Sequence, residues 1–285
     1  MKTYLDCISC FFRQGLDAAR MTTEDEKIQK KILDEIAMIV PKFPLNSTPP
    51  EMGRIIHKIV CKFTNSSDPY KKVKDKYNKE ALKFYPELKK KTREAKDPLL
   101  VAIKIAIAGN VIDFGVNEVK NKIDIEKELK NTLKQDSAIF DYDKLKNFLE
   151  KTEEILYLGD NAGEIVFDRI LIEELQKKVI YVVREKPIIN DVTIEDALFA
   201  GIDKIAKVIS SGCDAPGTIL RYCSKEFLNH YYKAELIISK GQGNYETLSE
   251  EKRPIFFLLK AKCPIIAKDL GCRVGDIILK TQSLK

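Results

Sequence analysis

Carboxylate and amide side chains stand directly after a short apolar run in the middle of the chain. The run covers residues 155–158 and is followed by Gly159-Asp160-Asn161-Ala162-Gly163-Glu164. Apolar residues then recur at helical spacing, and this order predicts a strand, a polar turn and a helix. Ligands of open α/β sheets bind outside the carboxyl ends of the strands, so we expect chemistry at this turn. Its acids suit a cation, and the first N–H groups of the helix suit an anion.

A second carboxylate, Asp191, follows the next apolar run, at residues 179–183. Together, Asp160, Asn161 and Asp191 offer hard oxygen ligands, which suit Mg²⁺ or Mn²⁺ and leave coordination positions for water and substrate. Capping of the helices that follow is an equally common use of aspartate. Spacing alone therefore leaves metal binding and helix capping open for both acids.

Basic and glycine residues near these acids are suited to hold an anionic group. Arg184 and Lys262 supply positive charge, while Gly241 and Gly243 let backbone N–H groups approach a ligand. None of these four signals is specific when it is taken alone.

An unusually apolar helix is predicted over residues 99–115, and it carries two polar residues on one face. Asn110 and Asp113 are three positions apart, so their side chains are neighbours on the helix. Buried polar groups need partners, which helix capping or an internal hydrogen bond would supply. The other interpretation is that this face lines a cavity. The helix by itself favours the first interpretation.

The chain changes character near residue 150. We expect helices over residues 3–20, 24–40, 51–63, about 70–91 and 99–115, and strands over 155–158, 179–183, 206–209, 236–239 and 264–267. Strands that alternate with helix-length segments predict βα units and a mostly parallel sheet, so the fold class is α/β. We place a helical N-terminal region at residues 1–150 and an α/β core at 151–285. Polar segments follow four of the strands and should meet along one rim.

Composition narrows the function classes. The 285-residue chain is 44% apolar and 32% charged, and its net charge is +6. Its lysines are interleaved with acids, which indicates a solvated surface and no nucleic-acid footprint. No apolar run is long enough to span a membrane, and the N-terminus lacks a signal-peptide pattern. Seven cysteines argue against a secreted disulfide framework. We expect a cytoplasmic protein, and the oligomeric state is open.

Cys7 and Cys10 form a CxxC pair near the start of the chain. The pair suits half a zinc site, a redox couple or two helix-face residues. No second CxxC exists, although His57 and Cys61 lie at i, i+4 spacing on one predicted helix and are able to contribute ligands. We rank a structural role above a metal role, and both above catalysis.

Several of these segments, taken in order, resemble the damage-control phosphatases, the family catalogued as domain of unknown function 89. The matching segments span nearly the whole chain: Cys7-Ile8-Ser9-Cys10, Asp68-Pro69-Tyr70, Gly109-Asn110-Val111-Ile112-Asp113, Gly159-Asp160-Asn161-Ala162-Gly163-Glu164, Asn190-Asp191-Val192-Thr193, Lys240-Gly241-Gln242-Gly243-Asn244-Tyr245-Glu246 and Lys262-Cys263. The N-terminal cysteine pair resembles the compact microbial branch. Gln242 departs mildly from the pattern, where threonine or methionine is more usual.

The resemblance implies a Rossmann-like core behind the helical region and metal-dependent hydrolysis of phosphomonoesters of small metabolites, such as sugar phosphates or damaged phosphorylated cofactor intermediates. It implies a divalent ion (Mn, Co, Ni or Mg) on Asp160, Asn161 and Asp191. We assign catalysis to Asp160, Asp191 and Lys262, with either water or an aspartate as the nucleophile. The expected substrate-binding residues are Asn110, Asp113, Gly163, Glu164, Arg184, Gly241, Gly243 and Asn244.

The resemblance also favours the second interpretation of the apolar helix over residues 99–115, in which its polar face lines a cavity. We expect it to pack over the carboxyl ends of the strands, with Asn110 facing the metal site. Replacing Asn110 with alanine should then lower turnover while leaving stability nearly unchanged.

Other function classes fit less well. A haloacid-dehalogenase phosphatase requires DxD after its first strand, whereas this chain has Asp160-Asn161-Ala162 there. The segment Gly241-Gln242-Gly243 lacks the third glycine of the dinucleotide-binding fingerprint. An S-adenosylmethionine-dependent carboxyl methyltransferase is the second choice, because a Rossmann-like core alone does not exclude it. A non-enzymatic basic binding protein is the third.

Overall fold

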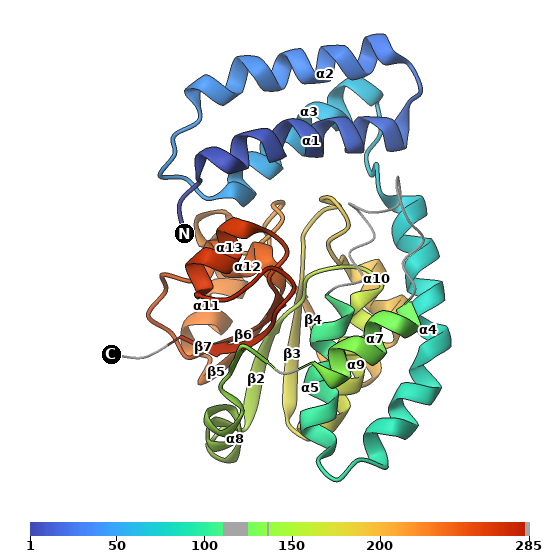
Figure 1. Cartoon of the computed structure of the whole chain (residues 1–285), viewed down its shortest axis with the longest axis vertical. Helices are drawn as coiled ribbons and strands as arrows, with labels where there is room; N and C mark the ends of the chain where they lie inside the picture. Colours follow the sequence, from blue (N-terminus) through green and yellow to red (C-terminus); the bar gives the residue numbers. More distant parts are fainter. Residues whose placement is uncertain (111–124, 136, 283–285) are drawn as a thin grey trace.

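The computed structural model describes residues 1–110, 125–135 and 137–282. These residues form a seven-stranded sheet in the order β1-β7-β6-β5-β2-β3-β4, with helices on both faces (Figure 1). All neighbouring pairs are parallel except β6 with β7. The strands are β1 (Ile139–Phe140), β2 (Glu154–Leu158), β3 (Lys178–Val183), β4 (Lys207–Ser210), β5 (Leu236–Lys240), β6 (Ile255–Lys260) and β7 (Ile277–Thr281).

The helices follow the apolar periodicity of the sequence. Several ends carry local stop or start signals: Thr48 and Glu51 form a capping box at the start of α3, and Asp97 caps α5 in front of a proline. The helices are α1 (Leu5–Thr22), α2 (Glu26–Ile39), α3 (Pro49–Thr64), α4 (Lys71–Arg93), α5 (Pro98–Gly109), α7 (Ile125–Lys134), α8 (Tyr142–Lys151), α9 (Glu164–Leu175), α10 (Ile194–Ala200), α11 (Lys225–Lys233), α12 (Gly241–Leu248) and α13 (Pro264–Leu270).

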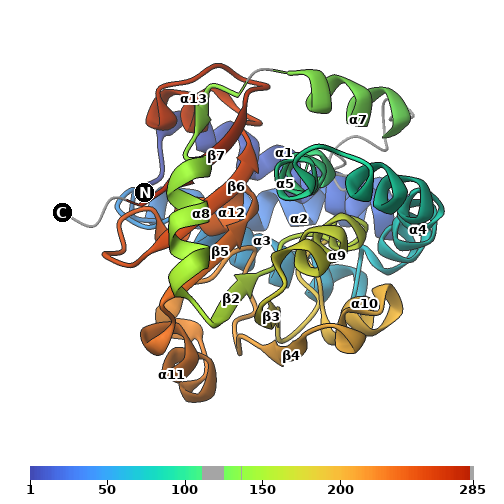
Figure 2. The same cartoon turned by 90° about the horizontal axis from the view of Figure 1, so that it is seen from below.

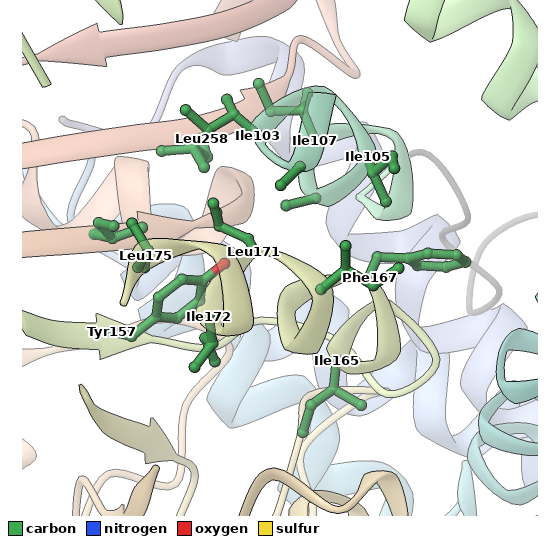
Figure 3. Close-up of a cluster of buried hydrophobic side chains, with 14 of the residues drawn as sticks. Ile103, Ile105, Ile107, Tyr157, Ile165, Phe167, Leu171, Ile172, Leu175 and Leu258 are labelled. Carbon is green, nitrogen blue, oxygen red and sulfur yellow. The ribbon is translucent and has the colours of Figure 1, made fainter. Parts of the chain in front are cut away.

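Alternate residues of each strand enter different apolar cores, because successive side chains point to opposite faces of a sheet. On β2, Ile155 and Tyr157 join the core beneath α4, α5, α8, α9 and α10, whereas Leu156 and Leu158 join the core beneath α11, α12 and α13. Figure 2 shows this sandwich of helices around the sheet from below. The close-up in Figure 3 shows Ile107 of α5 beside Phe167 and Leu171 of α9 in the first of these cores.

A third apolar core lies within the first three helices. It contains Phe11 of α1, Ile32 and Ile36 of α2 and Met52 of α3. These helices lie across one end of the sheet (Figure 1), and we call α1, α2 and α3 the helical cap. By packing, α4, α5 and α8 belong with the sheet, although they precede residue 152. The boundary at residue 150 stays a prediction.

The α/β class with a mostly parallel sheet after an N-terminal helical region is confirmed. One local prediction was wrong, and one strand was not predicted. Residues 264–267 lie in α13, because Pro264 stands at the first helical position and is not a strand residue. The strand belongs to the apolar run Ile255–Lys260, which had not been assigned.

The apolar helix α5 is also placed differently from our expectation. Its described residues pack along α9 on one face of the sheet, and residues 111–115 of the predicted helix lie outside the described residues. Its C-terminal cap, Asn110, hydrogen-bonds Asp160 in the turn that follows β2.

Candidate active site

A cavity of about 360 Å³ separates the helical cap from the carboxyl ends of the strands. Its floor contains Asp160 and Asn161 after β2 and Asp191 after β3, and Lys262 lines it from the segment after β6. Its opposite wall comes from α1 and from the start of α3. The volume lies within the range usual for small-molecule sites.

Asp160 is held by the amides of two asparagines. Its Oδ2 atom accepts hydrogen bonds from Nδ2 of Asn110 at 3.0 Å and Nδ2 of Asn161 at 2.7 Å. The backbone carbonyl of Asp160 accepts from Val192 N–H at 2.8 Å, which joins the two strand ends. A side chain at Gly241, whose φ is +78°, would overlap the Asp160 carboxylate. Asp160 is therefore held from three sides and faces the cavity.

Asp191 is held by a buried arginine. Arg184 donates from Nε to Oδ2 of Asp191 at 2.7 Å, and its two Nη atoms donate to Thr218 and Asn244, each at 3.0 Å. Only 1% of the surface of Arg184 is exposed, and the residue does not line the cavity. Its position thus differs from the one expected of a substrate contact: Arg184 orients Asp191. A bridge between Asn161 and Asp191 holds the two turns together.

A second charged network lies beneath the floor. Lys240 donates to Glu164 at 2.6 Å, to Asp168 and to the carbonyl of Ala106 at 2.9 Å. Glu164 also accepts hydrogen bonds from the amides of Asn110 and Asn161. Lys240, Glu164 and Asp168 are fully buried. This network supports the two asparagines that hold Asp160.

Buried negative charge exceeds buried positive charge in the floor and the network beneath it. The four buried carboxylates of Asp160, Glu164, Asp168 and Asp191 face two fully buried cations, Lys240 and Arg184. Burial, together with the charges of Glu164 and Asp191, raises the pKa of Asp160 well above its usual range, although Lys262 and Arg184 oppose this rise. A bound cation would relieve this excess.

The remaining expected residues fall into two groups. Lys262 and Gly243 line the cavity. Gly163, Glu164, Gly241 and Asn244 lie outside its lining. The N–H of Gly163 is occupied, because it donates to Asn78 Oδ1 at 2.6 Å. Asn244 donates to the carbonyls of Gly159 and Lys240, so it ties the ends of β2 and β5 together. Asp113 lies outside the described residues.

Sequence reasoning missed most of the wall contributed by α1. Six polar or thiol residues of this helix line the cavity, at positions 6, 7, 10, 13, 14 and 17. The spacing of these positions places them on one helix face. That periodicity was readable, but nothing in it shows that the face meets the site. Lys240 stands in one of the matching segments, and its place at the end of the buried strand β5 is a signal in its own right, because lysines are rarely buried without a partner.

Comparison with known proteins places the chain in a family. The model of the damage-control phosphatase ARMT1-like domain matches residues 3–278. The chain is 38% identical to a damage-control phosphatase of Pyrococcus horikoshii over the full length of both, and 35% identical to one of Archaeoglobus fulgidus, covering 96% of this chain and 97% of the relative. The chain belongs to this family.

The structural comparison agrees with this assignment. A crystal structure of a DUF89 family protein of Pyrococcus horikoshii superimposes with a TM-score of 0.90 at 37% identity, covering 99% of this chain and 100% of the other. An uncharacterized protein of Methanocaldococcus jannaschii is 42% identical, covering 96% of this chain and 93% of its own length. Family membership therefore agrees with the resemblance noted from the motifs. Among the helices that the structure describes, none combines the length and apolarity that a membrane crossing requires.

Proposed function

We propose that this damage-control phosphatase family member is a metal-dependent hydrolase that removes phosphate from phosphomonoesters of small metabolites. Sugar phosphates and damaged phosphorylated cofactor intermediates are the substrate classes we favour. The observation that carries the proposal is the pair of buried carboxylates, Asp160 and Asp191, which two independent sets of donors hold at the floor of one cavity. The two relatives named as damage-control phosphatases support hydrolysis over methyl transfer.

The chemistry of the floor fits a divalent cation. Asp160 and Asp191 supply carboxylate oxygens, and Asn161 turns its amide nitrogen toward Asp160 and Glu164, which leaves its amide oxygen for a ligand. Among the described residues, no three His, Cys, Asp or Glu side chains are arranged as a metal site, so the set would be two carboxylates and one amide. Mn²⁺, Co²⁺, Ni²⁺ and Mg²⁺ all accept such ligands. When bound, the ion would supply Lewis-acid polarisation of a phosphoryl oxygen.

The chain's own groups would hold the phosphoryl group. Lys262 lines the cavity, where its ammonium would balance the negative charge of the substrate. Gln242 and Gly243 lie in the first turn of α12, where backbone N–H groups have no partner within the helix and attract anions. Oxygen atoms of Asp160 and Asp191 would accept hydrogen bonds from the attacking water and orient it.

A substrate screen tests this proposal. Purified protein would be assayed for phosphate release from sugar phosphates and cofactor fragments, with Mn²⁺, Co²⁺, Ni²⁺ or Mg²⁺ and with a chelator. We expect turnover only with metal, and its loss in Asp160→Asn and Asp191→Asn. The matched control is Asp203→Asn, which changes an exposed aspartate and should leave turnover unchanged. Turnover that survives the chelator, or transfer of a methyl group from S-adenosylmethionine without phosphate release, would reject the proposal.

A further inference from the structure

The loop that carries Asp191 has an unusual backbone two residues earlier. Ile189 has φ +47°, a left-handed conformation that β-branched residues rarely adopt. Asn65 and Gln176 are the other described non-glycine residues with positive φ, and both end helices, where this conformation is common. Ile189 ends no helix. Such a conformation persists only where the surroundings hold it in place.

A histidine of the helical cap supplies part of that hold. The N–H of Ile189 donates to Nδ1 of His57, on α3, at 3.4 Å. His57 is 6% exposed, and its burial lowers its pKa to about 4, so the ring is neutral near pH 7 and accepts the bond. The ring also stacks on Tyr70, with centroids 6.4 Å apart and planes 28° apart. The acceptor atom, Nδ1 of His57, is therefore fixed by packing between α3 and Tyr70.

The side chain of Ile189 supplies the rest. It packs against the apolar core of the helical cap, the core that contains Phe11 and Tyr70, and it lines the cavity. Ile189 thus lies in the β3–α10 loop but belongs by its contacts to the cap. The cap holds this loop through one backbone hydrogen bond and one apolar side chain.

Backbone hydrogen bonds connect Ile189 to both carboxylate residues, Asp191 and Asp160. Asp191 N–H donates to the carbonyl of Ile188 at 3.0 Å, which closes the turn around Ile189. On either side of Asp191, the carbonyl of Asn190 accepts from Ala162 N–H and the N–H of Val192 donates to the carbonyl of Asp160, each at 2.8 Å. A shift at Ile189 would therefore move Asp191 relative to Asp160.

We propose that His57 and Ile189 are positioning residues through which the helical cap sets the place of Asp191 beside Asp160. Neither residue performs chemistry. The catalytic consequence rests on the proposed function, whereas the order of the loop does not. The cap is accordingly part of the site's framework as well as the wall above it.

Paired substitutions separate positioning from general packing. His57→Leu removes the acceptor, along with a buried Nε2 atom that has no partner among the described residues, while His57→Asn keeps an acceptor at the same place along the side chain. Ile189→Gly removes the apolar anchor but allows positive φ, while Ile189→Leu keeps the anchor. The controls are His230→Leu, at the chain's other histidine, and Gln176→Gly, at another residue with positive φ.

Amide hydrogen exchange of peptides covering residues 187–193 measures the order of the loop without metal. We expect exchange at least roughly tenfold faster than wild type in His57→Leu and Ile189→Gly, because local opening sets this rate. The exchange in His57→Asn, Ile189→Leu and both controls should stay near wild type. Wild-type exchange in both His57→Leu and Ile189→Gly would overturn the proposal, and so would equal acceleration in His57→Leu and His230→Leu.

Calorimetric titration with Mn²⁺ measures the consequence for the site. Loss of an outer partner of a metal ligand commonly weakens affinity by roughly tenfold or more, and we expect this in His57→Leu but not in His57→Asn. Faster exchange with unchanged Mn²⁺ affinity would overturn the claim that the loop positions Asp191. If the wild-type protein bound none of Mn²⁺, Co²⁺, Ni²⁺ and Mg²⁺, the proposed function would fail, while the exchange result would still decide whether the cap orders the loop.

Discussion

Asp160 and Asp191 receive their hydrogen bonds from different kinds of donor. Asp160 accepts from neutral amides, whereas Asp191 accepts from the guanidinium of Arg184. Amides hold an oxygen without supplying a positive charge, so these two partners leave the charge of Asp160 uncompensated, and burial raises the pKa of Asp160. Asn110 and Arg184, expected as substrate contacts, are donors to these two carboxylates, and their role in substrate binding stays a prediction.

Asn110 is a support whose loss should affect both activity and stability. Its Nδ2 serves Asp160 and Glu164, and its Oδ1 accepts from Lys260 N–H at 3.3 Å. Asn110→Ala should lower turnover at least roughly tenfold, as expected for an outer partner of a ligand, and cost about 1–3 kcal/mol in the free energy of unfolding, because buried carboxylates lose partners. Urea denaturation and phosphate release measure the two effects. Asn131→Ala, at an exposed asparagine, is the control, and unchanged turnover in Asn110→Ala would contradict the assignment.

Gly241 and Gly271 provide a matched test of space beside Asp160. Both have positive φ, at +78° and +72°, but an added Cβ would overlap Asp160 only at Gly241 and would meet nothing within 4 Å at Gly271. Gly271→Ala should cost about 1–2 kcal/mol from backbone strain alone and leave turnover unchanged. Gly241→Ala should cause the same backbone strain and should also abolish turnover. A paired assay of thermal unfolding and phosphate release would measure both effects. Equal activity in the two variants would show that Asp160 has room to move.

Among the elements, α9 links the sheet to the site. Asp168, in the middle of this helix, accepts hydrogen bonds from Tyr157 of β2 at 2.8 Å and Tyr181 of β3 at 2.9 Å, and pairs with Lys240 of β5. Burial raises the pKa of Asp168 to about 6 even though Lys240 opposes the rise. One carboxylate therefore fixes α9 against three neighbouring strands.

Breaking this link should destabilise the whole fold. Asp168→Asn leaves Lys240 with a single carboxylate partner in a fully buried place. Removal of one member of a buried ion pair typically costs about 3–5 kcal/mol, and we expect a loss of that size in urea denaturation. Asp203→Asn, at an exposed aspartate, should change nothing measurable. A loss below about 1 kcal/mol, the usual value of exposed pairs, would show that Lys240 finds another partner.

The sequence predicted elements where periodicity was strong and failed where composition was ambiguous. Predicted helices over 3–20 and 51–63 correspond to α1 and α3, and the apolar runs before Asp160 and Asp191 are strands β2 and β3. Residues 264–267 are a short apolar run that suits a strand or a helix equally, and the structure places them in α13. The run is too short for its apolar pattern to distinguish a strand from a helix, so the prediction for residues 264–267 was wrong.

At the scale of the molecule, the site forms where the helical cap meets the carboxyl edge of the sheet (Figure 1). The rim of the sheet was predictable, since parallel strands bring their carboxyl ends to one edge. The elements that form the opposite wall were not predictable from the sequence, because the wall depends on how α1 and α3 pack against loops that are distant along the chain. The family resemblance pointed to α5 as this wall, but α5 is unusually apolar and packs on a face of the sheet.

We propose that Asp160 and Asp191 together hold a divalent ion for phosphomonoester hydrolysis. Calorimetric titration of Mn²⁺ into wild-type protein and into the Asp160→Ala, Asp191→Ala double variant tests it most directly. We predict saturable binding of one ion to the wild type and none to the double variant, whose urea denaturation must show a folded protein. Mn²⁺ affinity equal to that of wild type in a folded double variant would contradict the account.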